Sequence, residues 1–205
     1  HPHARITSID TAAAATMPGV RLVLTGAELQ AAGVKIMAKP IMHKRADGGR
    51  PASPDRHLLA VERVRFVGEC VVAVVADTEQ QARDAAEAVQ VDYEPLPHAV
   101  TLADALAPNA PLLSDAPDNK VAESRHGDAA QAQAAFARAR HVVELDITNQ
   151  RVVALSIEPR SVQAHIDQGR LVVRMSSQMP TGIRTQICDL LGLKESQVRV
   201  LVGDV

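Results

Sequence analysis

The 205-residue sequence contains very few aromatic residues: one tyrosine, two phenylalanines and no tryptophan. Proteins that bind single-stranded nucleic acids without sequence preference stack successive bases on aromatic side chains. A chain with so few of these rings cannot provide such a surface. The composition therefore argues against this class of nucleic-acid-binding protein.

The sequence also lacks an excess of charge of either sign. It has 22 lysine and arginine residues against 24 aspartate and glutamate residues, a formal net charge of -2 and a pI near 6.5. Binding to nucleic acids or anionic lipids through charge requires a basic surface, which this balance does not supply. We therefore expect no nucleic acid among the partners.

Long hydrophobic runs and export signals are missing as well. No segment approaches the roughly 18 consecutive apolar residues of a membrane-spanning helix. Residues 1–30 contain no basic stretch followed by an apolar core and a cleavage site, so no secretory signal is expected. The pattern predicts a cytoplasmic protein without a membrane span.

Only two cysteines occur, Cys70 and Cys188, and they form no C-x-x-C motif. The chain therefore lacks the cysteine framework of a zinc or iron–sulfur site, and it suits a reducing compartment. Both cysteines lie among apolar residues, which predicts buried, unreactive thiols.

What the sequence does contain is typical of a globular protein. Hydrophobic residues make up 46% and charged residues 22%, and the length allows one large domain or two small ones. The chain begins close to a strand-like segment without an initial methionine, and it stops within another such segment. We therefore expect a piece of a longer polypeptide.

Strand and helix patterns alternate in the N-terminal part. Strands are expected at residues 4–10 and 21–25, and short helices at 11–17 and 27–33. Asp10 can cap the first helix, and Gly33 can end the second.

Residues 34–58 are polar and rich in glycine and proline, with a basic centre. This composition predicts a long loop. Such loops are either functional or surface excursions that contact other parts of a protein, and we favour the excursion.

Residues 64–94 predict a strand–helix–strand unit. After a break at Gly68, the apolar run at 70–76 is typical of a strand buried on both faces. Thr78 can cap the following helix, and a strand at 89–94 ends at prolines. The helix presents a face of small residues, Ala82, Ala85, Ala86 and Val89. A right-handed crossover is expected.

The strand-to-helix junction of this unit, V-A-D-T-E-Q-Q, does not suit a nucleotide. It has no glycine to admit a phosphate, and Glu79 would repel one at the start of the helix. We therefore exclude a nucleotide site at this junction.

Residues 108–127 are mostly polar and indicate a boundary between two domains. A short capped helix precedes the boundary at 101–106. After it, helices are expected at 128–139 and 181–193, and strands at 141–152, 161–167, 170–177 and 197–202. The dipeptide Gln168–Gly169 predicts a hairpin. The last helix should turn four residues inward, Ile183, Ile187, Leu190 and Leu191.

Eight segments together carry a family resemblance: HARITSID, MPGVRLVLTG, VRFVGEC, AAEAVQVDYEPLP, HGDAAQAQAAFARARHVVE, IEPR, SSQMP and LLGLKESQVRVLVGDV. In this order they resemble the large, molybdenum-binding subunit of the molybdenum hydroxylases. This family includes aerobic carbon monoxide dehydrogenases, xanthine dehydrogenases and aldehyde oxidases. The resemblance covers nearly the whole chain outside the 34–58 loop. Cys70 and Ser177 depart from the proline and threonine that relatives usually have.

The resemblance implies an α+β fold in two parts. Residues 1–110 would form an α/β hammerhead domain, residues 111–126 a linker, and residues 127–205 the first part of a mixed α/β molybdenum-cofactor-binding domain. In relatives a GGGFG stretch that packs against the pterin, and later a catalytic glutamate, follow the position of Val205. The 205 residues alone are therefore expected to be inactive.

Gln178 is the functional position that the resemblance implies. It matches the glutamine of the family's S-T-Q motif, whose side-chain amide donates to an oxygen ligand of molybdenum, so it counts as both catalytic and cofactor-binding. A neutral amide suits this role because it donates without a charge that competes for the metal. The residue lies between a strand and a helix, where α/β ligand sites collect. No metal ligand is expected from this chain.

The resemblance further implies a molybdenum–molybdopterin cofactor, in its cytosine dinucleotide form, and a small-molecule substrate. Iron–sulfur clusters of the 2Fe-2S type and FAD would lie elsewhere, because this chain has no cysteine framework for clusters. The expected partners are an FAD-binding medium subunit and an iron–sulfur small subunit. The intact enzyme is expected to be an oligomer.

Glu158 and Arg160, in the segment I-E-P-R, could act as an acid and a substrate clamp. A neighbouring glutamate and arginine more often form a structural ion pair, and we favour that interpretation.

Other candidates are weaker. His1 and His3 are spaced for a metal, but near the start of the chain we expect them to be solvated. Ser176 and Ser177 lack the Gly-x-Ser-x-Gly motif, so a serine hydrolase is not supported.

Two hypotheses from different classes follow. The first is a segment of a molybdenum-dependent oxidoreductase that hydroxylates a small substrate or oxidises carbon monoxide. The second is a stand-alone structural or interaction module with a hammerhead fold and no metal. A gene that continues into GGGFG and a later glutamate would exclude the second.

Overall fold

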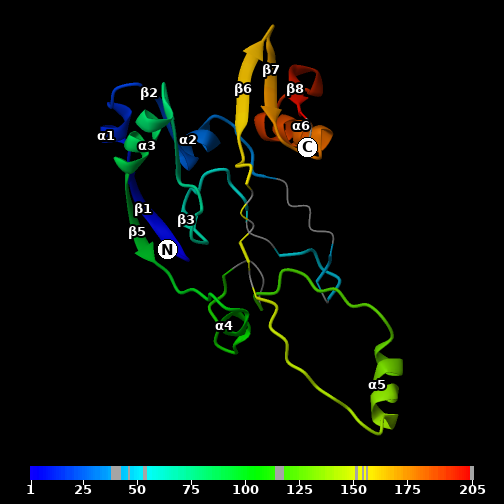
Figure 1. Cartoon of the computed structure of the whole chain (residues 1–205). Helices are drawn as coiled ribbons and strands as arrows, with labels where there is room; N and C mark the ends of the chain where they lie inside the picture. Colours follow the sequence, from blue (N-terminus) through cyan, green and yellow to red (C-terminus); the bar gives the residue numbers. More distant parts are fainter. Residues whose placement is uncertain are drawn as a thin grey trace.

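The computed structural model describes residues 1–37, 43–45, 47–52, 55–113, 118–150, 152–153, 155 and 157–203. These residues form two groups of strands and helices, joined by long segments along which α4 (Leu102–Leu106) and α5 (Ala129–Arg138) lie (Figure 1). The separate small sheets and their helices agree with the predicted α+β class.

The first group contains two small antiparallel sheets. One has the strand order β3-β1-β5, and the other pairs β2 with β4. The strands are β1 (Ala4–Asp10), β2 (Val20–Thr25), β3 (Arg63–Val64), β4 (Val72–Ala76) and β5 (Gln90–Pro95). The helices are α1 (Ala12–Ala15), α2 (Gly26–Ala31) and α3 (Glu79–Glu87).

Small side chains dominate the core of this group. Ala4, Ala60 and Val64 form one buried cluster. Ala14 of α1 and Ala85 of α3 are completely buried. Because alanine side chains are short, α1 and α3 can approach the strands and each other closely, as the alanine-rich pattern of α3 predicted.

Two expectations for residues 64–94 are wrong. β4 pairs with β2 and β5 pairs with β1, so the strands that flank α3 belong to different sheets and no parallel crossover joins them. Val75 of β4 is 50% exposed, so the run at 70–76 is not buried on both faces. A local apolar pattern specifies a strand, but it does not choose the neighbouring strand or the number of packed layers.

Capping boxes begin two of the helices. The Thr25 side chain accepts from the Glu28 N–H at the start of α2, and the Glu28 carboxylate accepts from the Thr25 N–H at 2.7 Å. Thr101 and Asp104 repeat this arrangement at α4. The Thr25 N–H, and then its hydroxyl, hold the pKa of Glu28 below its usual value.

Thr25→Ala is expected to lower the free energy of unfolding by about 1 kcal/mol at pH 7, because a helix N–H loses its acceptor. Thr11→Ala is the matched control, since Thr11 precedes α1 without a side-chain capping hydrogen bond. Urea unfolding of the three proteins measures both effects.

The cost of Thr25→Ala should also depend on pH. The lowered pKa of Glu28 means that its carboxylate stabilises the fold above the ordinary carboxyl pKa, and that this contribution is lost as the pH falls through the lowered value. The gap between the variant and the wild type should therefore narrow in acid. A gap that stays constant down to the acid transition would contradict the role of Glu28.

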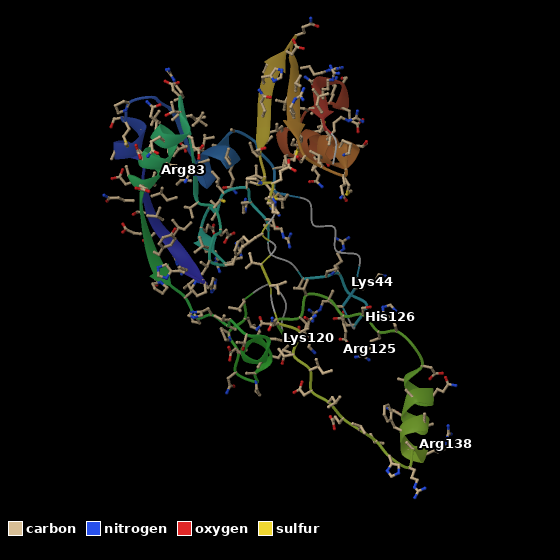
Figure 2. The ribbon with its side chains drawn as sticks, in the orientation of Figure 1. Lys44, Arg83, Lys120, Arg125, His126 and Arg138 are labelled. Carbon is tan, nitrogen blue, oxygen red and sulfur yellow. The ribbon has the colours of Figure 1, made fainter. Side chains whose placement is uncertain are left out.

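The described parts of the 34–58 segment are an excursion that contacts the polar segment after α4. The Ala52 N–H donates to the Val121 carbonyl at 3.0 Å, and the Glu123 N–H donates to the Lys44 carbonyl at 2.9 Å. The Arg45 guanidinium donates to Asp118 at 3.1 Å and holds the pKa of that carboxyl below its usual value. Figure 2 shows Lys44 beside Lys120 and Arg125 where the two segments meet.

The second group is a three-stranded sheet with the order β6-β7-β8. Its elements are β6 (Val162–Asp167), β7 (Arg170–Met175), α6 (Pro180–Leu191), the short 3-10 helix η1 (Glu195–Gln197) and β8 (Val198–Leu201). β6 and β7 form the predicted hairpin, with Gln168 and Gly169 at φ values of 48° and 78°. β7 and β8 are parallel, joined through α6.

Burial in this group departs from the sequence pattern in β6, whose six residues are all exposed, and at the end of α6. Val172, Val173, Cys188 and Val198 are buried. Leu191, which was expected to face inward, is 46% exposed, because α6 ends there and the chain turns away at Gly192 in the left-handed region. Among the described residues, a backbone hydrogen bond from the Lys35 N–H to the Leu190 carbonyl at 2.9 Å links the segment after α2 to α6.

The strand expected at residues 141–152 is not formed in the described part of that range. Residues 141–150 have no regular structure, and Val143, Leu145 and Ile147 are 77–82% exposed. A strand requires a neighbour for its backbone hydrogen bonds, and no described strand pairs with this segment. Figure 1 shows the segment as an extended trace between α5 and β6. Apolar and polar residues alternate in this segment, but no described strand lies beside it to accept its backbone hydrogen bonds.

Among the described residues, no helix has both the length and the apolar character needed to cross a membrane.

Candidate functional site

Gln178 lies in the bend between β7 and α6, as the sequence predicts. Its side chain is exposed, and it has no hydrogen-bond partner among the described residues. An amide in this position keeps both its donor and its acceptor available to a bound group. Because β7 and β8 are parallel, the bend lies at the carboxyl end of a β-α-β unit, where ligands bind in related sheets.

The bend is shaped by the residues on either side of Gln178. The Met179 N–H donates to the Ser177 hydroxyl at 3.0 Å, which closes a short turn. Pro180 occupies the first turn of α6, where its fixed φ suits a helix start and its missing N–H costs no hydrogen bond. The Ser177–Met179 hydrogen bond and the fixed φ of Pro180 together restrict the backbone around Gln178.

The start of α6 has no side-chain cap. Met179 is the residue before the helix, and its side chain does not accept from the first-turn N–H groups. These groups carry partial positive charge and prefer an oxygen acceptor or an anion. The start of α6 therefore differs from those of α2 and α4, where threonine side chains already serve as acceptors.

A hollow of about 420 Å³ opens beside the first turn of α6. Its lining includes Arg170, Thr181, Arg184, Glu195 and Arg199. Arg184 donates to Glu195 at 2.8 Å, yet its Nε is buried without a hydrogen-bond partner in the described part of the chain. The hollow therefore presents charged and hydroxyl side chains, including three arginines, which suit an oxygen-rich ligand. The sequence pattern did not identify Arg184 as a candidate site residue. Its neighbour in the chain, Ile183, was expected to face inward.

Glu158 contacts the strand that leads into the bend. The Ser176 hydroxyl donates to Glu158 Oε1 at 2.8 Å. This contact brings the segment I-E-P-R against the segment S-S-Q-M-P, and sequence reasoning missed it because the two residues are 18 positions apart. The ion pair expected between Glu158 and Arg160 is absent from the described part of the chain, and the Arg160 side chain is exposed.

Among the other candidate residues, His1 is exposed as expected, His3 is half-buried, and the expectation that Cys70 is buried is wrong. His1 packs its ring against Tyr93, with 5.2 Å between the ring centroids, and His3 Nδ1 lies 2.8 Å from the Pro97 carbonyl, so both histidines have contacts. Cys70 is exposed, because the chain turns outward between β3 and β4, whereas Cys188 is buried as predicted. No group of three metal-ligating side chains is found among the described residues.

Comparison with known proteins identifies two family models. Residues 1–97 match the a/b hammerhead domain of aldehyde oxidase and xanthine dehydrogenase, and residues 112–205 match the molybdopterin cofactor-binding domain. Together the two models account for most of the chain, in the order that the sequence segments predicted.

The chain is similar to large subunits of several enzymes. It is 35% identical over 220 residues to the carbon monoxide dehydrogenase large chain of Afipia carboxidovorans, covering 100% of this chain and 26% of that protein. It is 34% identical over 206 residues to the nicotine 6-hydroxylase large subunit of Paenarthrobacter nicotinovorans, covering 98% and 24%. The chain thus spans about a quarter of the length of these relatives.

Solved structures show the same arrangement of elements. The crystal structure of a Cu,Mo-CO dehydrogenase superimposes with a TM-score of 0.82 at 34% identity, covering 100% of this chain and 26% of the other. Quinoline 2-oxidoreductase from Pseudomonas putida 86 gives a TM-score of 0.80 at 32% identity, with the same coverage. The likeness extends over both groups of elements.

Proposed function

Because the chain belongs to the molybdenum hydroxylase family, we propose that it is part of the catalytic large subunit of a molybdenum-dependent oxidoreductase. The observation that carries this proposal is the ordered match of a hammerhead model and a molybdopterin cofactor-binding model over residues 1–97 and 112–205. The relatives named above are large subunits of such enzymes.

The residues around the start of α6 fit a molybdenum–molybdopterin cofactor. The Gln178 amide and the first-turn N–H groups, which Met179 does not cap, are neutral donors, and Arg170, Arg184 and Arg199 line the hollow beside α6 as charged donors. A pterin with a phosphate group offers many oxygen and nitrogen acceptors to such a set. When bound, the cofactor would supply the two-electron chemistry of substrate oxidation.

Within this proposal, Gln178 holds and orients the cofactor. Its amide would donate to an oxygen acceptor on the bound group, and the Ser177–Met179 turn and Pro180 would keep the amide at the carboxyl end of β7. Because the amide is neutral, it can orient its acceptor without competing for the metal. In this proposal, Gln178 therefore positions the bound cofactor and stabilises it through one hydrogen bond.

The proposal includes a division of the chain and a set of partners. We assign residues 1–110 to the hammerhead domain, 111–126 to a linker and 127–205 to the first part of the cofactor-binding domain; no described residue from 111 to 126 forms a helix or strand. The proposed partners are an FAD-binding medium subunit and a 2Fe-2S small subunit. The proposal also includes the cytosine dinucleotide form of the cofactor, an oligomeric assembly and a cytoplasmic location.

Metal analysis of the complete subunit tests this function. When it is co-expressed with its neighbouring subunits and purified, we expect molybdenum and a pterin in stoichiometric amounts, and oxidation of a small carbonyl or heterocyclic substrate, or of carbon monoxide. The 205-residue chain alone is expected to show no turnover. A complete, folded subunit that lacks both molybdenum and pterin would support the alternative of a structural module.

A further inference from the structure

Two successive serine hydroxyls precede Gln178 and make contacts in different directions. The Ser177 hydroxyl accepts from the Met179 N–H at 3.0 Å, within the bend. The Ser176 hydroxyl donates to Glu158 Oε1 at 2.8 Å, outside the bend. The bend is therefore tied to its own backbone by one hydroxyl and to a distant segment by the other.

The Glu158 contact is the part of this arrangement that local sequence does not explain. A carboxylate that accepts from a hydroxyl forms a charge-assisted hydrogen bond, which is stronger and more directional than a neutral one. Both side chains are exposed, and the bond favours one orientation of the Ser176 side chain, two residues before Gln178. Among the described residues, the hydrogen bond that Glu158 receives comes from Ser176, and Glu158 makes no ion pair with Arg160.

We propose that Glu158 is a positioning residue that acts through the Ser176 hydroxyl and holds the bend 176–179 in the conformation that presents the Gln178 amide. This inference rests on the proposed function, in which that amide contacts the cofactor. Glu158 itself contacts neither substrate nor cofactor. It narrows the range of positions that the amide can occupy before a ligand arrives, which is the effect of supporting residues around other metal centres.

The effect should appear in turnover more than in substrate binding. In the complete enzyme, Glu158→Ala and Ser176→Ala should each lower kcat by about 10- to 100-fold with little change in KM, as loss of a supporting hydrogen bond does elsewhere. The double variant should be no slower than either single variant, because both remove the same hydrogen bond. Glu158→Gln retains an acceptor oxygen and should recover most of the activity.

A second measurement does not depend on the cofactor. In the 205-residue chain, amide hydrogen exchange followed by NMR should be faster at Met179 in Glu158→Ala and in Ser176→Ala than in the wild type. Glu144→Ala and Ser161→Ala are the matched controls, since both side chains are exposed outside the bend, and they should leave this exchange rate unchanged.

The two measurements separate the possible failures. Unchanged exchange at Met179 in Glu158→Ala would overturn the positioning role, whatever the function of the protein. Faster exchange with unchanged kcat in an enzyme that loses activity on Gln178→Ala would also overturn it, because the bend would then move without consequence. Full activity in Gln178→Ala would instead remove Gln178 from the mechanism, and with it the catalytic reason for holding the bend.

Discussion

Replacing Gln178 by alanine in the complete, cofactor-loaded enzyme is expected to lower kcat by about 100- to 1,000-fold, the usual cost of removing one pre-positioned hydrogen-bond donor. The side chain is exposed and has no hydrogen-bond partner among the described residues, so its loss removes no hydrogen bond within the described part of the chain. The folded structure and the molybdenum content should therefore be retained. Steady-state kinetics and metal analysis of the same preparation measure the two quantities.

Gln163→Ala is the matched control for this prediction. Gln163 is an exposed glutamine on β6, in the same sheet but outside the bend. It should keep wild-type kcat, KM and molybdenum content. Wild-type activity in Gln178→Ala would contradict the proposed contact. Loss of molybdenum together with activity would indicate that the amide is needed for loading the cofactor rather than for turnover.

Val173→Asp is expected to destabilise the β6–β8 sheet severely, by at least about 3 kcal/mol, because it buries a charge without a partner. Val173 is 5% exposed in the central strand, paired with Ala164 on one side and Val200 on the other. Urea unfolding of the 205-residue chain, followed by circular dichroism and by proteolysis of the C-terminal group, would measure the loss.

Val143→Asp makes the same chemical change where no destabilisation is expected. Val143 is 82% exposed in the extended segment before β6. Its replacement should change the free energy of unfolding by less than about 0.5 kcal/mol. A comparable loss in the two variants would mean that residues 141–150 pack within this chain, contrary to the structure.

The two positions also illustrate which elements a sequence pattern can predict, because both lie in segments that were expected to be strands. The hairpin β6–β7, the helix α6, the cap at Thr78 and the capped helix that begins after Thr101 could be predicted, because each depends on residues within a few positions of one another. The alternation at 141–152 was equally regular, yet no strand forms over its described residues. A strand is completed by hydrogen bonds to a neighbour, which its own residues cannot supply.

The same distinction applies to the candidate site. The position of Gln178 between a strand and a helix followed from the S-S-Q-M-P segment, and the structure places it there. The contact of Glu158 with Ser176, and the buried Nε of Arg184, could not be predicted, because they depend on how segments far apart in the sequence pack. For the same reason the favoured Glu158–Arg160 ion pair was wrong.

The sequence by itself determined the family, the α+β class, the β6–β7 hairpin and the helices, since ordered motifs, helix caps and turn residues act over short distances. Only the tertiary structure decided that β4 and β5 belong to different sheets, that Cys70 is exposed, and that Glu158 turns toward the bend. The physical reason is that each strand or side chain takes the neighbour that is most favourable among all surfaces of the folded chain. No local pattern encodes that choice.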